Sequence, residues 1–268
     1  MSARIRKIGI KDLFVSEPNP AWFGNPGNDA KNSNWSNSNW LKSRFHFSFA
    51  EWNGGRGNYG CLRVVNDDLV QPKRGFGKHG HGNMEICTYV LDGSLYHKDS
   101  MGTSESLPRG SIQFMTAGTG VQHEERNLSA GKPLRFIQTW ILPRSRGLKP
   151  NYGSFSADSS VQEERTNKWL HLVGDVKSNT GSSKIQINQD CNLYVAEIDA
   201  ENTLSFDLLN GRQGYLICVE GSASVNSRTE LLRHEACEVT GTGANSLVIQ
   251  GNAGDEKTHV MLFEMAAN

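Results

Sequence analysis

The sequence lacks several features that would place it in a broad functional class. Its 28 basic and 28 acidic side chains cancel, and the sequence pI is about 7.1. Proteins that bind nucleic acids or membrane surfaces depend on an excess of basic residues, so we expect no direct nucleic-acid binding and no membrane association. No apolar run approaches the ~18 residues that a membrane-spanning helix needs. No apolar signal-peptide core opens the chain either.

Cysteine is scarce and is not arranged for disulfides or zinc. The five cysteines form an odd set without a C-x-x-C spacing: Cys61, Cys87, Cys191, Cys218 and Cys237. Cys87 and Cys218 lie inside apolar runs, where a reduced thiol packs as a small hydrophobic group. This usage predicts a reducing compartment, which is the cytoplasm, and also the nucleus if the organism is eukaryotic.

Amphipathic helical patterns are also scarce, and short apolar runs bounded by Gly, Asn and Asp replace them. Runs of this kind indicate β-strands separated by turns. We expect strands at 45–50, 60–65, 84–91, 112–115 and 134–142. With 268 residues the chain can form one large domain or two of ordinary size. The sequence therefore predicts an all-β protein.

The two halves of the chain resemble each other. The run YLICVEG at 215–221 repeats the pattern of CTYVLDG at 87–93, an apolar strand that ends in an acidic residue and glycine. After residue 143 the pattern loosens into a polar stretch with a serine cluster. We therefore expect two similar β domains, at 1–145 and 169–268, joined by a linker at 146–168.

The segment from 18 to 40 is rich in Asn and Ser and contains the tripeptide Ser-Asn-Trp twice. Tryptophans in such a segment usually pin it to the domain surface, because the ring buries a large apolar area. They could instead line an entrance for a substrate. The sequence favours pinning and leaves the role of this segment open.

Two short motifs carry the chemistry of this chain. His79-Gly80-His81 is followed about forty residues later by His123-Glu124-Glu125. Residues two apart on a β-strand point to the same face, so each motif can project two side chains together. Three imidazoles and one carboxylate suit iron, nickel, manganese, copper or cobalt.

The choice of carboxylate is open from periodicity alone. If one strand continued from His79, Glu85 would point to the same face as His79 and His81. Glu125 would point to the same face as His123 on its own strand, so both carboxylates could face the site. The second half of the chain has no comparable pair, because His171, His234 and His259 are isolated. We expect these three to be structural or surface residues.

The residues around both motifs resemble the cupin superfamily and, within it, the pirin family. The resemblance rests on GFGKHGH at 75–81 with Glu85 and Gly93, on MTAGTGVQHEE at 115–125, on FHFSF at 45–49 and on QTW at 138–140. It covers most of residues 41–150 closely and the second half more weakly. Gly80 stands where pirins usually have proline, which gives the backbone more freedom between the two histidines.

The resemblance implies a fold and a ligand set. The fold is a bicupin, with two tandem antiparallel, jelly-roll-like β-barrels and a metal in the N-terminal barrel only. The implied ligands are His79, His81, His123 and Glu125, which leaves Glu85 to orient an imidazole from a second layer. The implied cofactor is one divalent transition metal, with Fe(II) expected ahead of Ni, Mn, Cu or Co, and no organic cofactor.

The activity implied by the resemblance is that of quercetin 2,3-dioxygenase. A flavonol chelates the metal, O2 adds across its heterocycle, and carbon monoxide leaves. Glu125 would then also be the catalytic base that takes the proton of the flavonol 3-hydroxyl. Two alternatives stand beside this expectation. One is an iron-dependent redox sensor that binds a transcription factor as its protein partner, and the other is a cupin that acts on a different small phenolic substrate.

Overall fold

The structure is a computed structural model that describes residues 4–27, 39–178, 181–241, 245–254 and 257–267. Strands dominate it, and the only α-helix among these residues is α1 (Ser159–Arg165), beside the 3-10 helices η1 (Ile10–Asp12) and η2 (Pro20–Phe23). No described helix is long and apolar enough to cross a membrane. The prediction of an all-β protein is confirmed.

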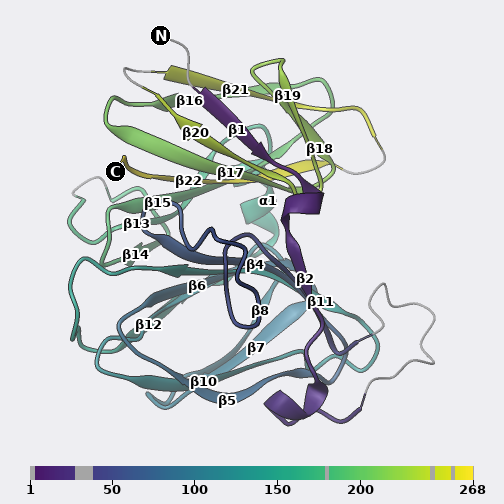
Figure 1. Ribbon diagram of the computed structural model, residues 1–268, viewed down its shortest axis with the longest axis vertical. Coiled ribbons are helices and arrows are strands. Elements are labelled where there is room, and N and C mark those ends of the chain that lie inside the picture. Colours follow the sequence, from purple (N-terminus) through teal and green to yellow (C-terminus); the bar gives the residue numbers. More distant parts are fainter. Residues whose placement is uncertain (1–3, 28–38, 179–180, 242–244, 255–256, 268) are drawn as a thin grey trace. The chain divides into compact units, whose positions relative to one another are not determined.

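The chain forms two compact units. The N-terminal unit contains Phe14–Asn58 and Leu62–Ala157, and the C-terminal unit contains Met1–Leu13, Tyr59–Cys61 and Asp158–Asn268. Each unit consists of one seven-stranded sheet and one four-stranded sheet (Figure 1). The expected jelly-roll-like arrangement is therefore present, as a pair of sheets in each unit rather than a closed barrel.

In the N-terminal unit the strand order of the large sheet is β12-β9-β6-β11-β4-β3-β2, and that of the small sheet is β5-β10-β7-β8. The strands are β2 (Phe14–Ser16), β3 (Leu41–Phe45), β4 (Leu62–Val70), β5 (Gly75–His81), β6 (Glu85–Asp92), β7 (Ser94–Asp99), β8 (Ser104–Pro108), β9 (Ile112–Thr116), β10 (Val121–Arg126), β11 (Leu134–Ile141) and β12 (Asn151–Phe155). Buried side chains from both sheets, among them Val90, Leu107 and Phe136, form one core cluster. Burial of this apolar face holds the two sheets together.

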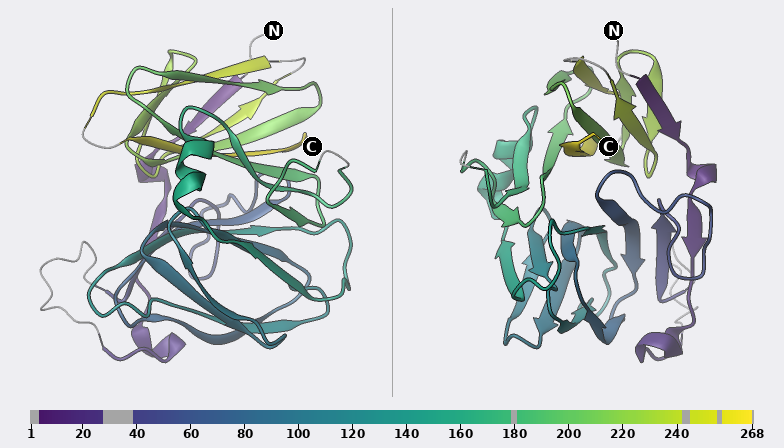
Figure 2. Two further views of the ribbon diagram at one scale, coloured as in Figure 1. Left: turned by 180° about the vertical axis from the view of Figure 1, so that it is seen from behind. Right: turned by 60° about the vertical axis from the view of Figure 1, so that its left-hand side comes forward.

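In the C-terminal unit the large sheet has the order β1-β20-β17-β22-β15-β13-β14 and the small sheet has the order β16-β21-β18-β19. The strands are β1 (Arg4–Ile8), β13 (Leu170–Asp175), β14 (Ile185–Ile187), β15 (Cys191–Ile198), β16 (Thr203–Leu208), β17 (Arg212–Glu220), β18 (Ser222–Val225), β19 (Thr229–Leu232), β20 (Ala236–Thr240), β21 (Asn245–Gly251) and β22 (Thr258–Ala266). Figure 2 shows the strands of each unit from two further sides.

The two units repeat one topology, as the duplication in the sequence predicts. The order β9-β6-β11-β4 in the first large sheet corresponds to β20-β17-β22-β15 in the second. Both β6 and β17 are followed directly by a glycine with positive φ, Gly93 at 78° and Gly221 at 66°. At Gly93 a side chain is also sterically excluded, because a Cβ would lie 2.6 Å from the carbonyl oxygen of Pro133.

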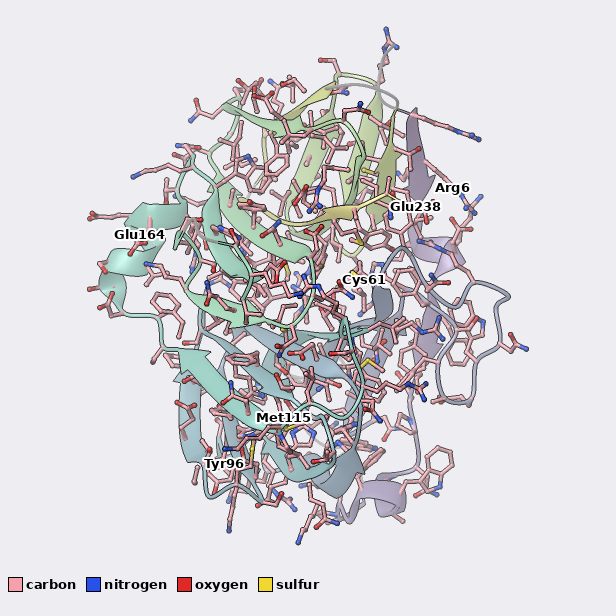
Figure 3. The ribbon with its side chains drawn as sticks, turned by 90° about the vertical axis from the view of Figure 1, so that its left-hand side faces the viewer. Arg6, Cys61, Tyr96, Met115, Glu164 and Glu238 are labelled. Atoms are coloured by element: carbon pink, nitrogen blue, oxygen red, sulfur yellow. The ribbon has the colours of Figure 1, made fainter. Side chains whose placement is uncertain are left out.

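The first strand of the chain belongs to the C-terminal unit, which differs from the predicted domain at 1–145. In this unit β1 pairs with β20 and takes the edge position that β12 takes beside β9 in the N-terminal unit. Lys7 binds Glu235 at 2.6 Å, and Arg6 lies 3.6 Å from Glu238. Figure 3 labels Arg6 on β1 and Glu238 on β20. The cause is an open sheet edge, which a basic, alternating strand can cover wherever it lies in the sequence.

Two further expectations differ from the structure. The segment 146–168, expected to be a linker, contains both β12 and α1. The strand expected at 45–50 is wrong, because β3 ends at Phe45 and the chain then turns at Ala50, which has φ 47°. A bridge between Phe49 and Trp52 closes this turn. A short apolar run does not by itself show where such a turn falls.

Trp40 shows how the end of the Asn- and Ser-rich segment is held. Its side chain is fully buried in the core cluster, and its Nε1 donates a hydrogen bond of 2.7 Å to the carbonyl oxygen of Pro18. The ring also packs edge-on against Phe76. The expected pinning therefore holds for Trp40, whereas Trp35 lies outside the described residues.

Candidate metal centre

Strands β5 and β10 bring three histidines together. His79 and His81 lie two residues apart on β5, and His123 on β10 is the direct partner of His79 in the antiparallel register. The three ring centroids are 4.5 to 4.9 Å apart, and the Nε2 atoms of His79 and His123 are separated by 3.1 Å. The convergence predicted from the two motifs is thus present for the three imidazoles.

The imidazoles of this cluster are in a state that can bind a metal ion through a nitrogen lone pair. Nδ1 of His79 lies 2.7 Å from the carbonyl oxygen of Gly77, so its N–H donates there and leaves Nε2 with a lone pair. Burial, together with the neighbouring imidazoles, lowers the pKa of His81 and of His123 to about 3. At neutral pH both rings are therefore uncharged, which is the form that binds a metal ion.

Glu125 lies beside this cluster but is held by other groups. A β-bulge separates it from His123. Its Oε1 accepts hydrogen bonds of 3.0 Å from Thr88 and from Gln113, and its Oε2 accepts one of 2.6 Å from Gln138. The potential ligand atoms of Glu125 and His123 lie within 4.8 Å of each other, but in a group with His97 rather than with the two histidines of β5. Its role as a ligand stays a prediction.

His97 is the residue that the sequence reasoning missed. It lies on β7 with no exposed surface, and its Nε2 is 3.1 Å from Oδ2 of Asp99. Its ring stacks on Tyr152 with centroids 4.6 Å apart, and its Nδ1 has no hydrogen-bond partner among the described residues. The His-x-Asp alternation at 97–99 was the signal in the sequence, since both side chains share one strand face.

Glu85 is placed differently from Glu125. It begins β6, is fully buried, and its Oε2 accepts a hydrogen bond of 2.8 Å from the hydroxyl of Thr116. The groups of potential metal ligands found among the described residues do not include it. Its role in orienting an imidazole stays a prediction.

A cavity of about 170 Å³ opens beside His79 and His81. Aromatic side chains dominate its wall, namely Trp22, Phe23, Phe45, Phe49, Phe76 and Trp140. Trp140 packs edge-on against His81 at 4.8 Å and donates a hydrogen bond of 3.1 Å to Oε1 of Gln138, the residue that holds Glu125. Trp22 is 67% exposed, so the cavity reaches the surface there. The Asn-rich segment thus also contributes to an entrance.

His171 and His259 of the C-terminal unit have partners within that unit. His171 contacts the hydroxyl of Ser182 and the amide oxygen of Asn192. His259 is buried, and its Nδ1 lies 2.9 Å from Glu220. Together with Glu197 these residues form a cluster of potential metal ligands, but Arg165 already forms an ion pair with Glu197 at 2.8 Å. A buried guanidinium supplies the positive charge that a metal ion would supply there.

The donor set in the N-terminal unit fits a transition metal. Two nitrogen ligands at right angles, each ~2.1 Å from an ion, lie ~3.0 Å apart, which matches the separation of the two Nε2 atoms. The fixed tautomer of His79 suits an imidazole ligand, because its Nδ1–H is held by the carbonyl oxygen of Gly77 and its Nε2 keeps the lone pair. His79, His81 and His123 would hold the ion, with Glu125 as the adjacent carboxylate.

Two jelly-roll-like units with a histidine cluster in the first define this protein as a two-domain cupin. Comparison with known families makes this more specific. Residues 29–141 match the Pirin family, and residues 176–265 match the quercetinase C-terminal cupin domain. The chain is 36% identical to the quercetin 2,3-dioxygenase of Escherichia coli K12 over 191 residues, which are 71% of this chain and 79% of that protein. This chain belongs to the pirin family.

Further relatives agree with this assignment. A pirin-like protein of Caulobacter vibrioides is 36% identical over 188 residues, covering 70% of this chain and 78% of that protein. The crystal structure of the bacterial pirin YhhW of Escherichia coli in complex with nickel(II) superposes with a TM-score of 0.79 at 26% identity. That comparison covers 99% of this chain and 100% of the other. The expected bicupin fold and pirin membership are confirmed.

Proposed function

We propose that this protein is a metal-dependent dioxygenase of the quercetin 2,3-dioxygenase type. It would open the heterocycle of a flavonol with O2 and release carbon monoxide. The observation that carries the proposal is the opening of His79 and His81 onto an aromatic-walled cavity. A planar phenolic ligand can therefore reach the histidine cluster while its rings pack against aromatic side chains. The names of the relatives support the same chemistry.

A divalent metal in this site would supply positive charge and exchangeable positions for the flavonol oxygens and for O2. We propose Fe(II) as the native ion, and the nickel(II) complex of YhhW supports nickel as the first alternative. His79, His81 and His123 would hold the ion. Neutral imidazoles leave its charge undiminished, which favours the ionised 3-hydroxyl of a flavonol.

Glu125 is the group proposed to take the 3-hydroxyl proton. Its carboxylate is surrounded by the amides of Gln113 and Gln138 and the hydroxyl of Thr88, all of which can donate to it. These contacts hold the buried carboxylate in place. The Trp140–Gln138–Glu125 hydrogen-bond chain links this carboxylate to the cavity wall, so a ligand that displaces Trp140 would also move Glu125.

The test is oxygen consumption by metal-loaded protein with quercetin, with carbon monoxide measured in the same reaction. We expect one carbon monoxide for each O2 and no need for a reductant, because both oxygen atoms end in the ring-opened product. The His79→Ala variant and chelator-treated protein are the controls and should show neither. Full metal loading without carbon monoxide from any flavonol would reject the proposal.

The size of the cavity favours a second candidate substrate class. A cavity of about 150 Å³ binds one benzene ring, and the cavity here is about 170 Å³. A three-ring flavonol must therefore extend through the mouth beside Trp22, whereas a single-ring phenol fits inside. Oxygen uptake with catechols and simple phenols, but not with flavonols, would assign the protein to this class. Failure with both classes, together with a protein partner bound in only one iron oxidation state, would indicate the redox sensor.

A further inference from the structure

The cavity has a polar stripe on the large sheet. Asn66 and Asp68 lie two residues apart on β4 and so share a face. Ser43 on β3 is the direct cross-strand partner of Asp68, and Gln138 on β11 is the partner of Asn66. All four side chains line the cavity. Asp67, between them in sequence, instead forms a buried pair with Arg135 at 2.7 and 2.9 Å.

Three side-chain oxygen atoms of this stripe lack hydrogen-bond partners among the described residues, namely Oγ of Ser43 and Oδ1 of Asn66 and of Asp68. Asp68 is 2% exposed and Asn66 is 5% exposed. Leaving a buried polar group unsatisfied costs about 1–3 kcal/mol, so such groups require an explanation. A ligand that donates a hydrogen bond inside the cavity would remove this cost.

Asp68 is also able to donate. Burial, with smaller contributions from the charges of Asp67 and Glu125, raises its pKa to about 8, although the Ser43 hydroxyl lowers it. At neutral pH the carboxyl group is therefore mostly protonated and carries one O–H donor besides its acceptor oxygen. This pair of functions matches a phenolic hydroxyl, which both donates and accepts.

We propose that Asn66 and Asp68 form the recognition site for a hydroxyl group on an aromatic ring held in the cavity. The aromatic walls hold the ring, and the side chains of Asn66 and Asp68 form hydrogen bonds with its hydroxyl substituent. The identity of the whole ligand as a flavonol rests on the proposed function, but the recognition of a hydroxylated ring does not. An unsubstituted ring would leave Oδ1 of both side chains buried and unsatisfied, and should bind more weakly.

The first experiment measures dissociation constants on metal-loaded protein without oxygen, by quenching of tryptophan fluorescence. Kaempferol carries ring hydroxyls, and 3-hydroxyflavone has the same chelating pair without them. We expect wild-type protein to bind kaempferol about tenfold more tightly, which corresponds to one satisfied buried group. Asp68→Leu and Asn66→Leu replace oxygens by methyl groups at nearly constant shape. Each should weaken kaempferol binding and strengthen binding of 3-hydroxyflavone.

These opposite changes in the two affinities distinguish the loss of hydroxyl recognition from a damaged cavity, because a misfolded cavity would bind both ligands more weakly. Asp68→Asn retains a donor and an acceptor and should keep most of the preference. Asp207→Leu removes a carboxylate from an exposed position on β16 and is the matched control. A wild-type preference that persists in both Leu variants, or an equal loss of both ligands, overturns the proposal and leaves the proposed function standing.

The second experiment separates the proposal from the proposed function. Phenol and benzene are titrated into chelator-treated protein, and ligand-observed NMR gives their affinities. We expect a phenol preference that is lost in Asp68→Leu. Loss of this preference, with no flavonol bound by metal-loaded protein, would reject the flavonol dioxygenase and retain the hydroxyl site. Phenol binding no tighter than benzene binding to the wild type would overturn the site whatever the flavonols do.

Discussion

The burial of Asp68 makes a quantitative prediction for the Asp68→Asn variant. The folded protein holds the pKa of this carboxyl group at about 8, against an ordinary value of 3.8. Because the folded state then binds more protons than the unfolded chain, its stability falls as the pH rises from about 4 to 8 and is constant above that. Asparagine does not titrate. The stability gained by Asp68→Asn should therefore grow with pH across this window.

The magnitude follows from the free energy of about 1.36 kcal/mol per pKa unit. Between pH 3.8 and pH 7 this gives a ceiling of ~4 kcal/mol, and local rearrangement that admits water reduces it. We expect a gain of about 1–3 kcal/mol at pH 7, or several degrees in melting temperature. His81 and His123, whose pKa values are lowered, destabilise both proteins equally as the pH falls from 6.5 to about 3, so they cancel in the difference.

The assay is thermal unfolding of chelator-treated protein, followed by circular dichroism from pH 5 to pH 8.5. Asp207→Asn, at an exposed position, is the control for loss of a carboxylate and should show no pH-dependent gain. A difference between wild type and Asp68→Asn that stays constant with pH would refute the reasoning. So would a wild type that is the more stable protein at pH 8, which would mean an ionised and paired Asp68.

Three further predictions concern the metal and the thiols. Elemental analysis should find close to one transition-metal ion per chain, lost in His79→Ala and His123→Ala but kept when the histidines of the C-terminal unit are changed; two ions per chain would contradict the single site. Glu125→Gln should reduce metal affinity and turnover far more than Glu85→Gln, whose loss as an outer partner costs about 10–100-fold; the reverse order would make Glu85 the ligand. In native protein a thiol reagent should modify Cys61 first, because this side chain is partly exposed and a hydrogen bond with a neighbouring thiol lowers its pKa. Equal labelling in Cys61→Ser would show that another thiol reacts.

The histidine motifs show which part of the candidate site a local sequence pattern can predict. Alternation on β5 and β10 places His79, His81 and His123 together, because the two-residue period is a property of any strand. The same period could not select between Glu85 and Glu125. That selection depends on a β-bulge after His123 and on the contacts that hold each carboxylate, and both are consequences of strand pairing.

His97 and Asp68 illustrate what strand patterns omit. The His-x-Asp alternation at 97–99 indicates only a shared strand face, and neither His97 nor Asp68 belongs to the two histidine motifs. They become functional candidates only because β7 pairs with β10 and because β4 lies between β3 and β11. An unsatisfied buried atom is defined by everything around it, so local sequence cannot reveal it.

The sequence by itself determined the all-β class, the duplication, the family and the three histidines, because each depends on short-range alternation or on motifs that stay contiguous along the chain. The tertiary structure alone decided that β1 completes the C-terminal unit, that the expected linker contains a strand and a helix, and that Asn66 and Asp68 face the cavity. The physical reason is that sheet edges and strand registers are satisfied by whichever segment buries its surface there, regardless of its distance along the chain.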